Sequence, residues 1–561
     1  MAEQLPIVYV RGFAGTTSGI NEQVDDPFYG FNLGSTHVRV GGGREPLFYQ
    51  FESPLLRLMI DHDYRLYVKG GQKTWLEQQK DATVDPNTIW IHRFYDISAS
   101  TWGDKPHAFR LERAAEDLLD LVELLQRKTG APRVHLVAHS MGGLICRSLI
   151  QKVIPDRQAT VRGSRKQAAD YVDRVFTYAT PHGGIEFDVG FGMLERLRDA
   201  FGIAGGDIFG PQRMYEYLTP GQAGRPPAGW RPQEMPDEAF PKERIFSLIG
   251  TNPEDYGAAW GLSSKAVGAK SDGLVQIENA YVPGAAFAFV HRSHSGRYGI
   301  VNSEEGYQNL RRFLFGQLEV QADIVGLRLP QPPGGDDVVW QAEAELSVRG
   351  LPILLHQQVA AHHCPIVLAL PEAADTADRP VPLVTTFLLA SPGLRPQDSE
   401  TARYALHLRI LSLRERNGVF NFGDHLEQTA DFDDILIVDV GQLDGRLAAW
   451  ARWNSQLPAL LRDYQPSGPP LADQEQAAGV WVSHIGLPDT ARAFLGETAA
   501  VRLTVRDRDH QGRSDLGTPH LTGGTAEAPG RDRSRHPAPA PDRRRSWIAR
   551  VARRIFARGS G

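Results

Sequence analysis

The stretch that decides the fold is Val134–Leu149, which reads VHLVAHSMGGLICRSL. Its first five residues read as a buried strand, and the residues after the two glycines follow a helical pattern. Between them lies one serine, Ser140, with the small residues Ala138 two positions before it and Gly142 two positions after it. A strand that reverses sharply into a helix strains its corner residue, and bulky neighbours would collide with both elements. The pattern therefore predicts a turn that lifts the Ser140 hydroxyl above a sheet, at a helix N-terminus where negative charge is stabilised.

The composition describes an ordinary globular chain. It has 561 residues, 41% of them hydrophobic and 23% charged, which predicts roughly two to four domains. The net charge of −6 gives no sign of a general nucleic-acid role. The charge is uneven, however, because residues 511–561 carry +7 and the remainder carries −13. Two cysteines, Cys146 and Cys364, exclude a disulfide framework and fit a reducing compartment.

The N-terminal segment and the length of the apolar runs bear on localisation. The N-terminal MAEQLPIVYVRGFAG has no basic n-region or long apolar h-region, and no run of about 18 apolar residues occurs. We therefore expect a cytoplasmic protein with peripheral membrane association as a further option. Export without a cleaved signal stays open.

Short apolar runs alternate with amphipathic helices over residues 1–316, which predicts an α/β domain with a doubly wound, mostly parallel sheet. A helix is expected at Ala108–Thr129 and a last one at Glu304–Leu314. Residues 184–242 form a long insertion rich in glycine, proline and phenylalanine, which is typical of a cap or of a packed subdomain. The expected strands are Pro6–Val10, Thr88–Phe94, Val134–Ala138, Arg174–Thr180, Arg244–Gly250 and Ala286–Val290.

Residues 317–508 change character. Several runs alternate apolar with polar residues between turn signals, which predicts an antiparallel β-sandwich-like domain, with Ala448–Tyr464 as an inserted helix. Gln331–Asp337 is either a turn or a linker. Residues 509–561 form a basic tail for which we expect disorder. Its segment 543–559 has the pattern of an amphipathic helix for an anionic membrane surface, although such tails also bind nucleic acid nonspecifically or stay solvated.

A serine hydroxyl is a poor nucleophile and needs a base, a carboxylate that orients the base, and two oxyanion donors. The glycine after the first strand lets a backbone N–H turn towards the site, so we assign the oxyanion donors to the N–H groups of Phe13 and Met141. A plain strand-to-loop glycine is the alternative reading.

The base and the acid are sought after the later strands. His294 stands in a loop next to Ser295 and Gly296 and is preferred over His291 at a strand end, while His182 could line the mouth of the site. For the acid, Asp272 precedes a glycine but lies more than twenty residues past the strand that ends at Gly250. Glu254 and Asp255 are closer alternatives, and a surface Asp-Gly turn is a common structure for this dipeptide.

Together AHSMGG, ATPHGG, SDGLV and HSGRYGIVNS place Ser140, Asp272 and His294 in the chain order of α/β-hydrolases. Residues 6–316 resemble α/β-hydrolase lipases and esterases, in the branch that includes GPI-inositol deacylase-like and bacterial lipase-like proteins. The resemblance implies cleavage of carboxylic esters, with lipids as expected substrates, through an acyl-enzyme on Ser140 and without a cofactor. The chain departs from the pattern at Ala138, where glycine is usual, and at Arg11, where histidine is common.

The sequence also fits other functions. An acyltransferase or a thioesterase would use the same three residues, and a lipid- or partner-binding protein could be built on an inactive hydrolase scaffold. The oligomeric state is open. A group of possible metal ligands, His356, His362, His363 and Cys364, is not expected to bind a metal, because adjacent residues of a strand point to opposite faces. No nucleotide-binding or HExxH motif occurs.

Overall fold

The chain folds, in a computed structural model, into elements that alternate much as the sequence predicts. The structure describes residues 4–12, 28, 30–40, 44–67, 71–94, 110–160, 166–185, 206–221, 224–254, 270–296, 299–330, 338–368, 380–389, 401–416, 425–443, 446–458, 460–461, 463–475 and 480–508. The tail from residue 509 onwards, for which we expected disorder and a membrane helix, lies outside these residues.

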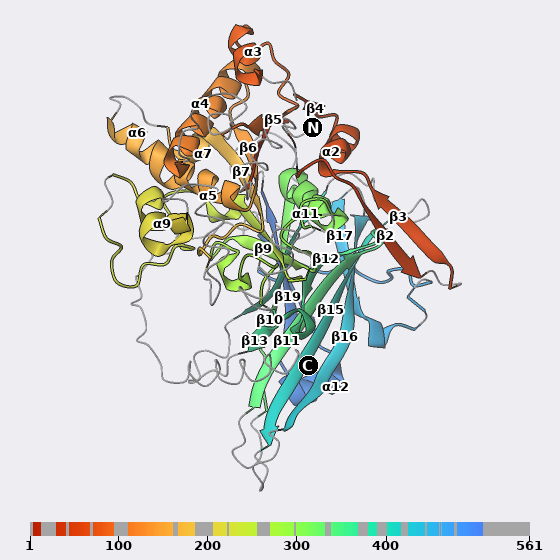
Figure 1. Ribbon diagram of the computed structural model, residues 1–561. Helices are drawn as coiled ribbons and strands as arrows, with labels where there is room; N and C mark the ends of the chain where they lie inside the picture. Colours follow the sequence, from red (N-terminus) through yellow and green to blue (C-terminus); the bar gives the residue numbers. More distant parts are fainter. Residues whose placement is uncertain are drawn as a thin grey trace. The chain divides into compact units, whose positions relative to one another are not determined.

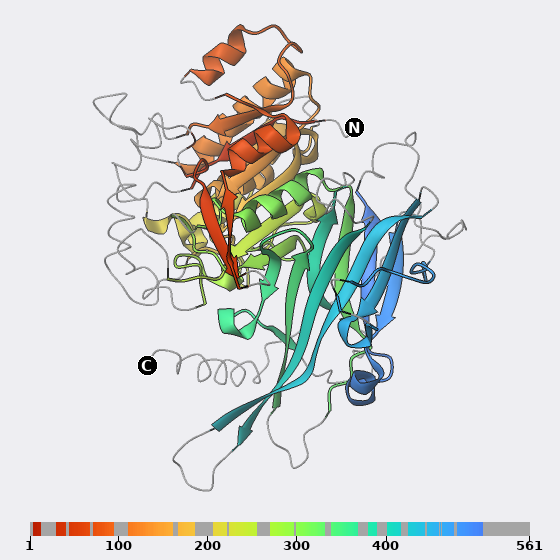
Figure 2. The same ribbon diagram turned by 90° about the vertical axis from the view of Figure 1, so that its right-hand side faces the viewer.

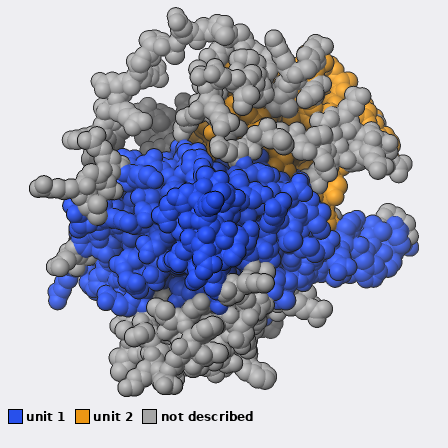
Figure 3. All heavy atoms as spheres, turned by 90° about the horizontal axis from the view of Figure 1, so that it is seen from above, with its two compact units in different colours: residues 1–315 blue, residues 316–561 orange. Residues whose placement is uncertain are grey.

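Two compact units make up the chain. Unit 1 comprises residues 1–315 and unit 2 comprises residues 316–561 (Figure 3). Within the described residues, no helix is both long and apolar enough to cross a membrane.

Unit 1 is built on a seven-stranded sheet in which every neighbouring pair is parallel. The order across the sheet is β4-β5-β1-β6-β7-β8-β9 (Figure 1). In chain order the strands are β1 (Ile7–Val10), β4 (Arg65–Leu66), β5 (Thr88–His92), β6 (Val134–His139), β7 (Val172–Tyr178), β8 (Ile245–Gly250) and β9 (Ala286–Val290). The central strands are buried on both faces, which explains why they read as continuous apolar runs rather than as alternating ones.

Helices cover both faces of this sheet. On one side α4 (Leu111–Thr129) and α5 (Met141–Ser148) pack on each other and on β6, and on the other α2 (Pro54–His62) and α11 (Glu304–Phe315) lie together (Figure 1). Helix α4 stops at Gly130, whose φ of 75° favours glycine at a helix C-cap. The expected doubly wound architecture is confirmed.

The remaining elements of unit 1 are shorter. A hairpin that the sequence analysis did not predict consists of β2 (Ser35–Val40) and β3 (Pro46–Phe51). The helical elements are α3 (Gln72–Gln78), η3 (Leu149–Val153), α6 (Ile154–Thr160), α7 (Ala168–Tyr171), η4 (Gly206–Phe209), α9 (Pro211–Leu218), η5 (Lys242–Arg244) and η6 (Ile277–Asn279).

Unit 2 contains two antiparallel sheets, as the alternating pattern predicts. One has the order β14-β10-β19-β18, and the other has the order β12-β11-β15-β16-β17 with β13 paired to β11. The long strands β15 and β16 extend past the others in Figure 2. The strands are β10 (Leu318–Val325), β11 (Val338–Val348), β12 (Leu354–Gln358), β13 (Ile366–Leu368), β14 (Val381–Leu388), β15 (Ala402–Arg416), β16 (His425–Leu443), β17 (Arg446–Trp453), β18 (Val480–Gly486) and β19 (Ala500–Asp507); the helical turns are η7 (Ala360–His362), η9 (Asn454–Gln456) and α12 (Asp489–Leu495).

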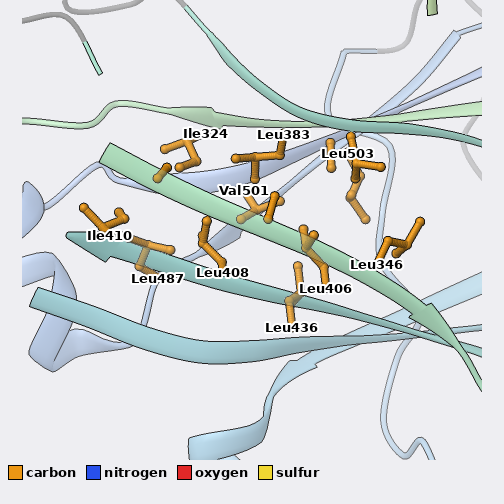
Figure 4. Packing of buried hydrophobic residues seen from close by; sticks show 14 of the residues in the cluster. Ile324, Leu346, Leu383, Leu406, Leu408, Ile410, Leu436, Leu487, Val501 and Leu503 are labelled. Atoms are coloured by element: carbon orange, nitrogen blue, oxygen red, sulfur yellow. The ribbon is translucent and has the colours of Figure 1, made fainter. Parts of the chain in front are cut away.

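A single apolar core joins the two sheets of unit 2. Ile324, Leu383, Val501 and Leu503 of one sheet and Leu346, Leu406 and Leu436 of the other belong to one buried cluster (Figure 4). The arrangement is that of a sandwich. The connecting segment Gln331–Asp337 lies outside the described residues.

The helix expected at Ala448–Tyr464 is wrong. Residues Arg446–Trp453 form strand β17, which pairs with β16 from Leu443↔Arg446 to Leu436↔Trp453. Alternate residues of this strand, Ala449, Ala451 and Trp453, contact the interior, so the pattern has a period of two rather than of a helix. Pairing with the long neighbour β16 outweighs the helical propensity of its alanines.

Candidate active site

Ser140 occupies a strained corner between β6 and α5. Its φ is 54° and its ψ is −129°, a backbone conformation that costs free energy in any residue other than glycine. Three hydrogen bonds hold the corner: the Ser140 N–H donates to the Tyr178 carbonyl at 2.9 Å, and its carbonyl accepts from Thr180 Oγ1 at 2.9 Å and from the Gly143 N–H at 3.1 Å. The surrounding structure therefore fixes the strained geometry that the sequence predicts.

The two glycines after Met141 are required by close contacts. A Cβ on Gly142 would lie 2.3 Å from the carbonyl oxygen of Val10, and one on Gly143 would lie 2.2 Å from Thr180 Oγ1. Real Cβ atoms essentially never lie so close to another heavy atom. Helix α5 can therefore start directly beside β1 and the loop after β7 only because these positions lack side chains.

The structure brings Ser140, His294 and Asp272 together. The distance between Ser140 Oγ and His294 Nε2 is 3.0 Å, and the distance between His294 Nδ1 and Asp272 Oδ2 is 2.9 Å. All three residues are at most 4% exposed. Both distances are within hydrogen-bond range.

Asp272 is oriented by its own turn. Its Oδ1 accepts from the N–H groups of Leu274 at 3.0 Å and Val275 at 2.8 Å, which leaves Oδ2 for His294. The backbone also joins the two loops, because the His294 N–H donates to the Asp272 carbonyl at 2.8 Å. The Asp-Gly turn is therefore buried and is not the surface turn that the dipeptide alone suggests.

These contacts fix the tautomer of His294. An ionised Asp272 can only accept, so His294 Nδ1 carries the proton and donates it. The Nε2 lone pair then faces the Ser140 hydroxyl as an acceptor. This arrangement can remove the hydroxyl proton while the imidazolium that forms is stabilised by the carboxylate.

His139 contacts His294 through its ring and through a hydrogen bond. Its ring lies 5.0 Å from the ring of His294, and its Nε2 is 2.9 Å from the backbone carbonyl of His294. Because a carbonyl only accepts, His139 Nε2 must donate its proton. Burial, and then electrostatic repulsion between the two imidazoles of His139 and His294, lower the pKa of His139 to about 3, so the His139 ring stays neutral.

The two predicted oxyanion donors are the backbone N–H groups of Met141 and Phe13. Met141 is the first residue of α5, and the first N–H groups of a helix have no partner within it. Phe13 lies outside the described residues. Its neighbour Gly12 passes close to Ser140, since a Cβ on Gly12 would lie 2.8 Å from Ser140 Cβ.

Two of the alternative candidates contact residues other than Ser140. His291 Nδ1 is 3.4 Å from Thr251 Oγ1, and burial, then Arg292, lower its pKa. His182 is buried, with Nε2 3.2 Å from Thr177 Oγ1. Glu254 is exposed and Asp255 lies outside the described residues.

The described part of the insertion packs against the helical layer. Arg213 of α9 forms an ion pair with Glu112 of α4 at 2.5 Å, and Phe209, Met214 and Tyr217 are buried. Residues 186–205, which carry most of the phenylalanines, lie outside the described residues.

Two of the histidines considered as metal ligands in unit 2 do not lie in a strand, as the sequence analysis had assumed. His362 ends η7 and His363 follows it with a φ of 58°, so the two residues lie in a turn rather than in a strand. Among the described residues, no group of three or more His, Cys, Asp or Glu side chains is placed to hold a metal ion.

Unit 1 has an α/β-hydrolase fold. Three features define it: the order of the strands in the sheet, the strained corner at Ser140, and the order of the site residues along the chain. No protein-family model and no curated protein matches the chain. The solved structures of the lin2722 product of Listeria innocua and of Aspergillus fumigatus lipase B are similar to it at 12% and 9% identity. The first match covers 56% of this chain and 94% of the other at a TM-score of 0.25, and the second covers 55% and 52% at 0.24.

Proposed function

We propose that the chain is a serine hydrolase that cleaves carboxylic esters through an acyl-enzyme on Ser140. The observation that carries the proposal is the pair of contacts from His294, at 3.0 Å to Ser140 Oγ and 2.9 Å to Asp272 Oδ2. They occur at a strained corner on the carboxyl end of β6, where α/β sheets bind their ligands.

The chemistry follows from these positions. His294 Nε2 takes the hydroxyl proton as Ser140 Oγ bonds to the ester carbonyl carbon, and Asp272 stabilises the imidazolium. The N–H of Met141, with that of Phe13 as predicted from the sequence, would donate to the oxyanion. The imidazolium then protonates the leaving alcohol, and a water molecule, deprotonated by His294, releases the acid and restores Ser140.

A lipid ester is the substrate class that we propose, as the resemblance of residues 6–316 to lipases and esterases implies. The phenylalanine-rich insertion suits an apolar acyl chain. Transfer of the acyl group to an acceptor other than water would use the same contacts, so products have to distinguish the two reactions.

Labelling with a fluorophosphonate tests the nucleophile. The wild-type protein should be labelled at Ser140, and Ser140→Ala should abolish labelling, whereas Ser347→Ala in strand β11 should leave it unchanged. Absence of labelling in a folded wild-type protein would exclude the proposed activity and would favour a binding protein on a hydrolase scaffold.

Products from mixed liposomes test the substrate class. With phospholipid, triacylglycerol and a short-chain ester present, mass spectrometry should show free fatty acid from the lipids in a Ser140-dependent manner. Release from the short ester alone would mean an esterase of small substrates, and acyl transfer to an added alcohol without hydrolysis would mean an acyltransferase.

A further inference from the structure

The sandwich of unit 2 is not filled evenly between its two sheets. Ile410 and Phe432 belong to the buried apolar cluster between the sheets. Further along the same strand pair, beside Leu406 and Val438, lies a cavity of about 70 Å³. Protein interiors contain few voids larger than a water molecule, and a single water needs roughly 10–15 Å³. The cavity is therefore large for a domain core.

Small side chains from both sheets create this space. Val320 and Ala322 of β10 line it from one sheet, and Val438, Val440 and Ala449 line it from the other. The period-two alternation of each strand directs these residues inwards. Valine and alanine side chains are short, so at these positions the two sheets do not fill the space between them.

The lining is carbon almost throughout. Among the described residues that line the cavity none is charged, and side-chain polar atoms belong to Thr386, Tyr404 and Trp481 alone. A buried water needs two to four polar partners, so water is a poor occupant. An empty apolar space loses the dispersion contacts of its walls, which favours an apolar occupant.

The burial of the lining gives the cavity a deep end and a mouth. Ala322 and Leu436 are buried, whereas Val320, Tyr404 and Val440 are half-buried. A molecule with an apolar end and a polar end can therefore leave its polar group outside. A peptide segment would bring backbone N–H and C=O groups into a space that cannot satisfy them.

We propose that this cavity binds the hydrocarbon end of a fatty acyl chain. The site consists only of residues from unit 2, and it does not depend on the activity proposed for Ser140. The acyl chain can belong to a free fatty acid or to a membrane lipid, since both present the same hydrocarbon.

Crystallography with a heavy-atom probe tests the location. The full-length Ser140→Ala protein is crystallised with ω-bromododecanoate, and the anomalous signal of bromine is mapped. A peak between Ala322 and Ala449 is expected. A map with bromine only outside the sandwich, or with none, overturns the proposal.

A matched pair of substitutions tests affinity. Ala449→Leu fills the cavity, whereas Ala451→Leu adds the same atoms two residues along β17, where the side chain packs against the core but does not line the cavity. In the Ser140→Ala background, calorimetric titration should show dodecanoate bound about tenfold more weakly by Ala449→Leu only. Because Ala449→Leu fills a void, its ligand-free melting temperature should not fall, and unchanged dodecanoate affinity in this folded variant would contradict the site.

Vesicles distinguish the two sources of the chain. If the site takes membrane lipids, Ala449→Leu should also reduce cosedimentation with phosphatidylcholine vesicles. Loss of dodecanoate binding alone identifies free fatty acid as the ligand, and retention of both forms of binding overturns the proposal.

Discussion

His139 Nε2 donates a hydrogen bond to the backbone carbonyl of His294 across 2.9 Å, although the two residues are 155 positions apart. Together with the bond from the His294 N–H to the Asp272 carbonyl, it holds both main-chain polar groups of His294. The residue before Ser140 thus holds the backbone of His294, the base of the proposed reaction.

Replacing His139 should therefore reduce turnover more than substrate binding. We expect His139→Phe to lower kcat for a short-chain ester about tenfold or more with little change in KM, because a misplaced base loses the in-line geometry with Ser140. His139→Gln retains a donor and should recover much of kcat. Equal loss in both variants, or a loss confined to KM, would mean that the hydrogen bond does not position His294.

Asp272→Asn should remove most of the activity without unfolding the protein. The amide oxygen can still accept from Leu274 and Val275, but the amide nitrogen next to His294 Nδ1 favours the wrong tautomer. A loss of about 10⁴ in kcat is expected. Asp237→Asn, at an exposed carboxylate, serves as the control, and near-normal turnover in Asp272→Asn would remove the carboxylate from the mechanism.

The sequence predicts the local parts of the site better than the contacts between segments that are distant along the chain. The corner at Ser140 is local, because small residues between an apolar strand and a helix already require it. Asp272 and His294 could be named from their motifs, but the distances that join them depend on how two loops fold back onto the sheet. His139 could not be found, since nothing local distinguishes a flanking residue from one that bonds a distant carbonyl.

Strands that are buried on both faces are the easiest to predict from the sequence. Buried parallel strands such as Val134–His139 read directly from the sequence because both faces are covered. Strand β17 was mistaken for a helix because its pairing with β16 is a tertiary interaction. The hairpin β2–β3 was missed because its residues Val38 and Phe48 are exposed, so their pattern does not follow burial.

Gly143→Ala should destabilise unit 1 through a specific clash. A Cβ would lie 2.2 Å from Thr180 Oγ1, and overpacking of this kind costs about 1–3 kcal/mol of unfolding free energy. Urea unfolding should show this loss, and Thr180→Ala in the same chain should recover part of it. Gly224→Ala is the control, because a Cβ there meets no atom within 4 Å. Strict additivity of the two substitutions would refute the contact.

The ion pair between Arg403 and Asp439 should be important for unit 2. Both side chains are buried, the Nε–Oδ1 distance is 2.9 Å, and Arg403 also donates to the carbonyls of Leu461 and Tyr464. Because Arg403→Met leaves a buried carboxylate, it should cost about 3–5 kcal/mol. Arg506→Met, which breaks a more exposed pair with Glu319, should cost less than about 1 kcal/mol. Similar losses in the two variants, measured by urea unfolding, would contradict this ranking.

Stability should fall as the pH is lowered from about 7 towards 4. Burial lowers the pKa of His92 and of His356 to about 4, so between that pH and the ordinary value of about 6.5 the unfolded chain binds protons that the folded chain does not. Unfolding free energy therefore rises with pH in this window, by up to about 1.4 kcal/mol per pH unit for each histidine. Urea unfolding of His92→Gln across this range should show a shallower slope for unit 1, whereas His484→Gln at an exposed position should leave the slope unchanged. A slope identical in the two variants would mean that His92 does not contribute.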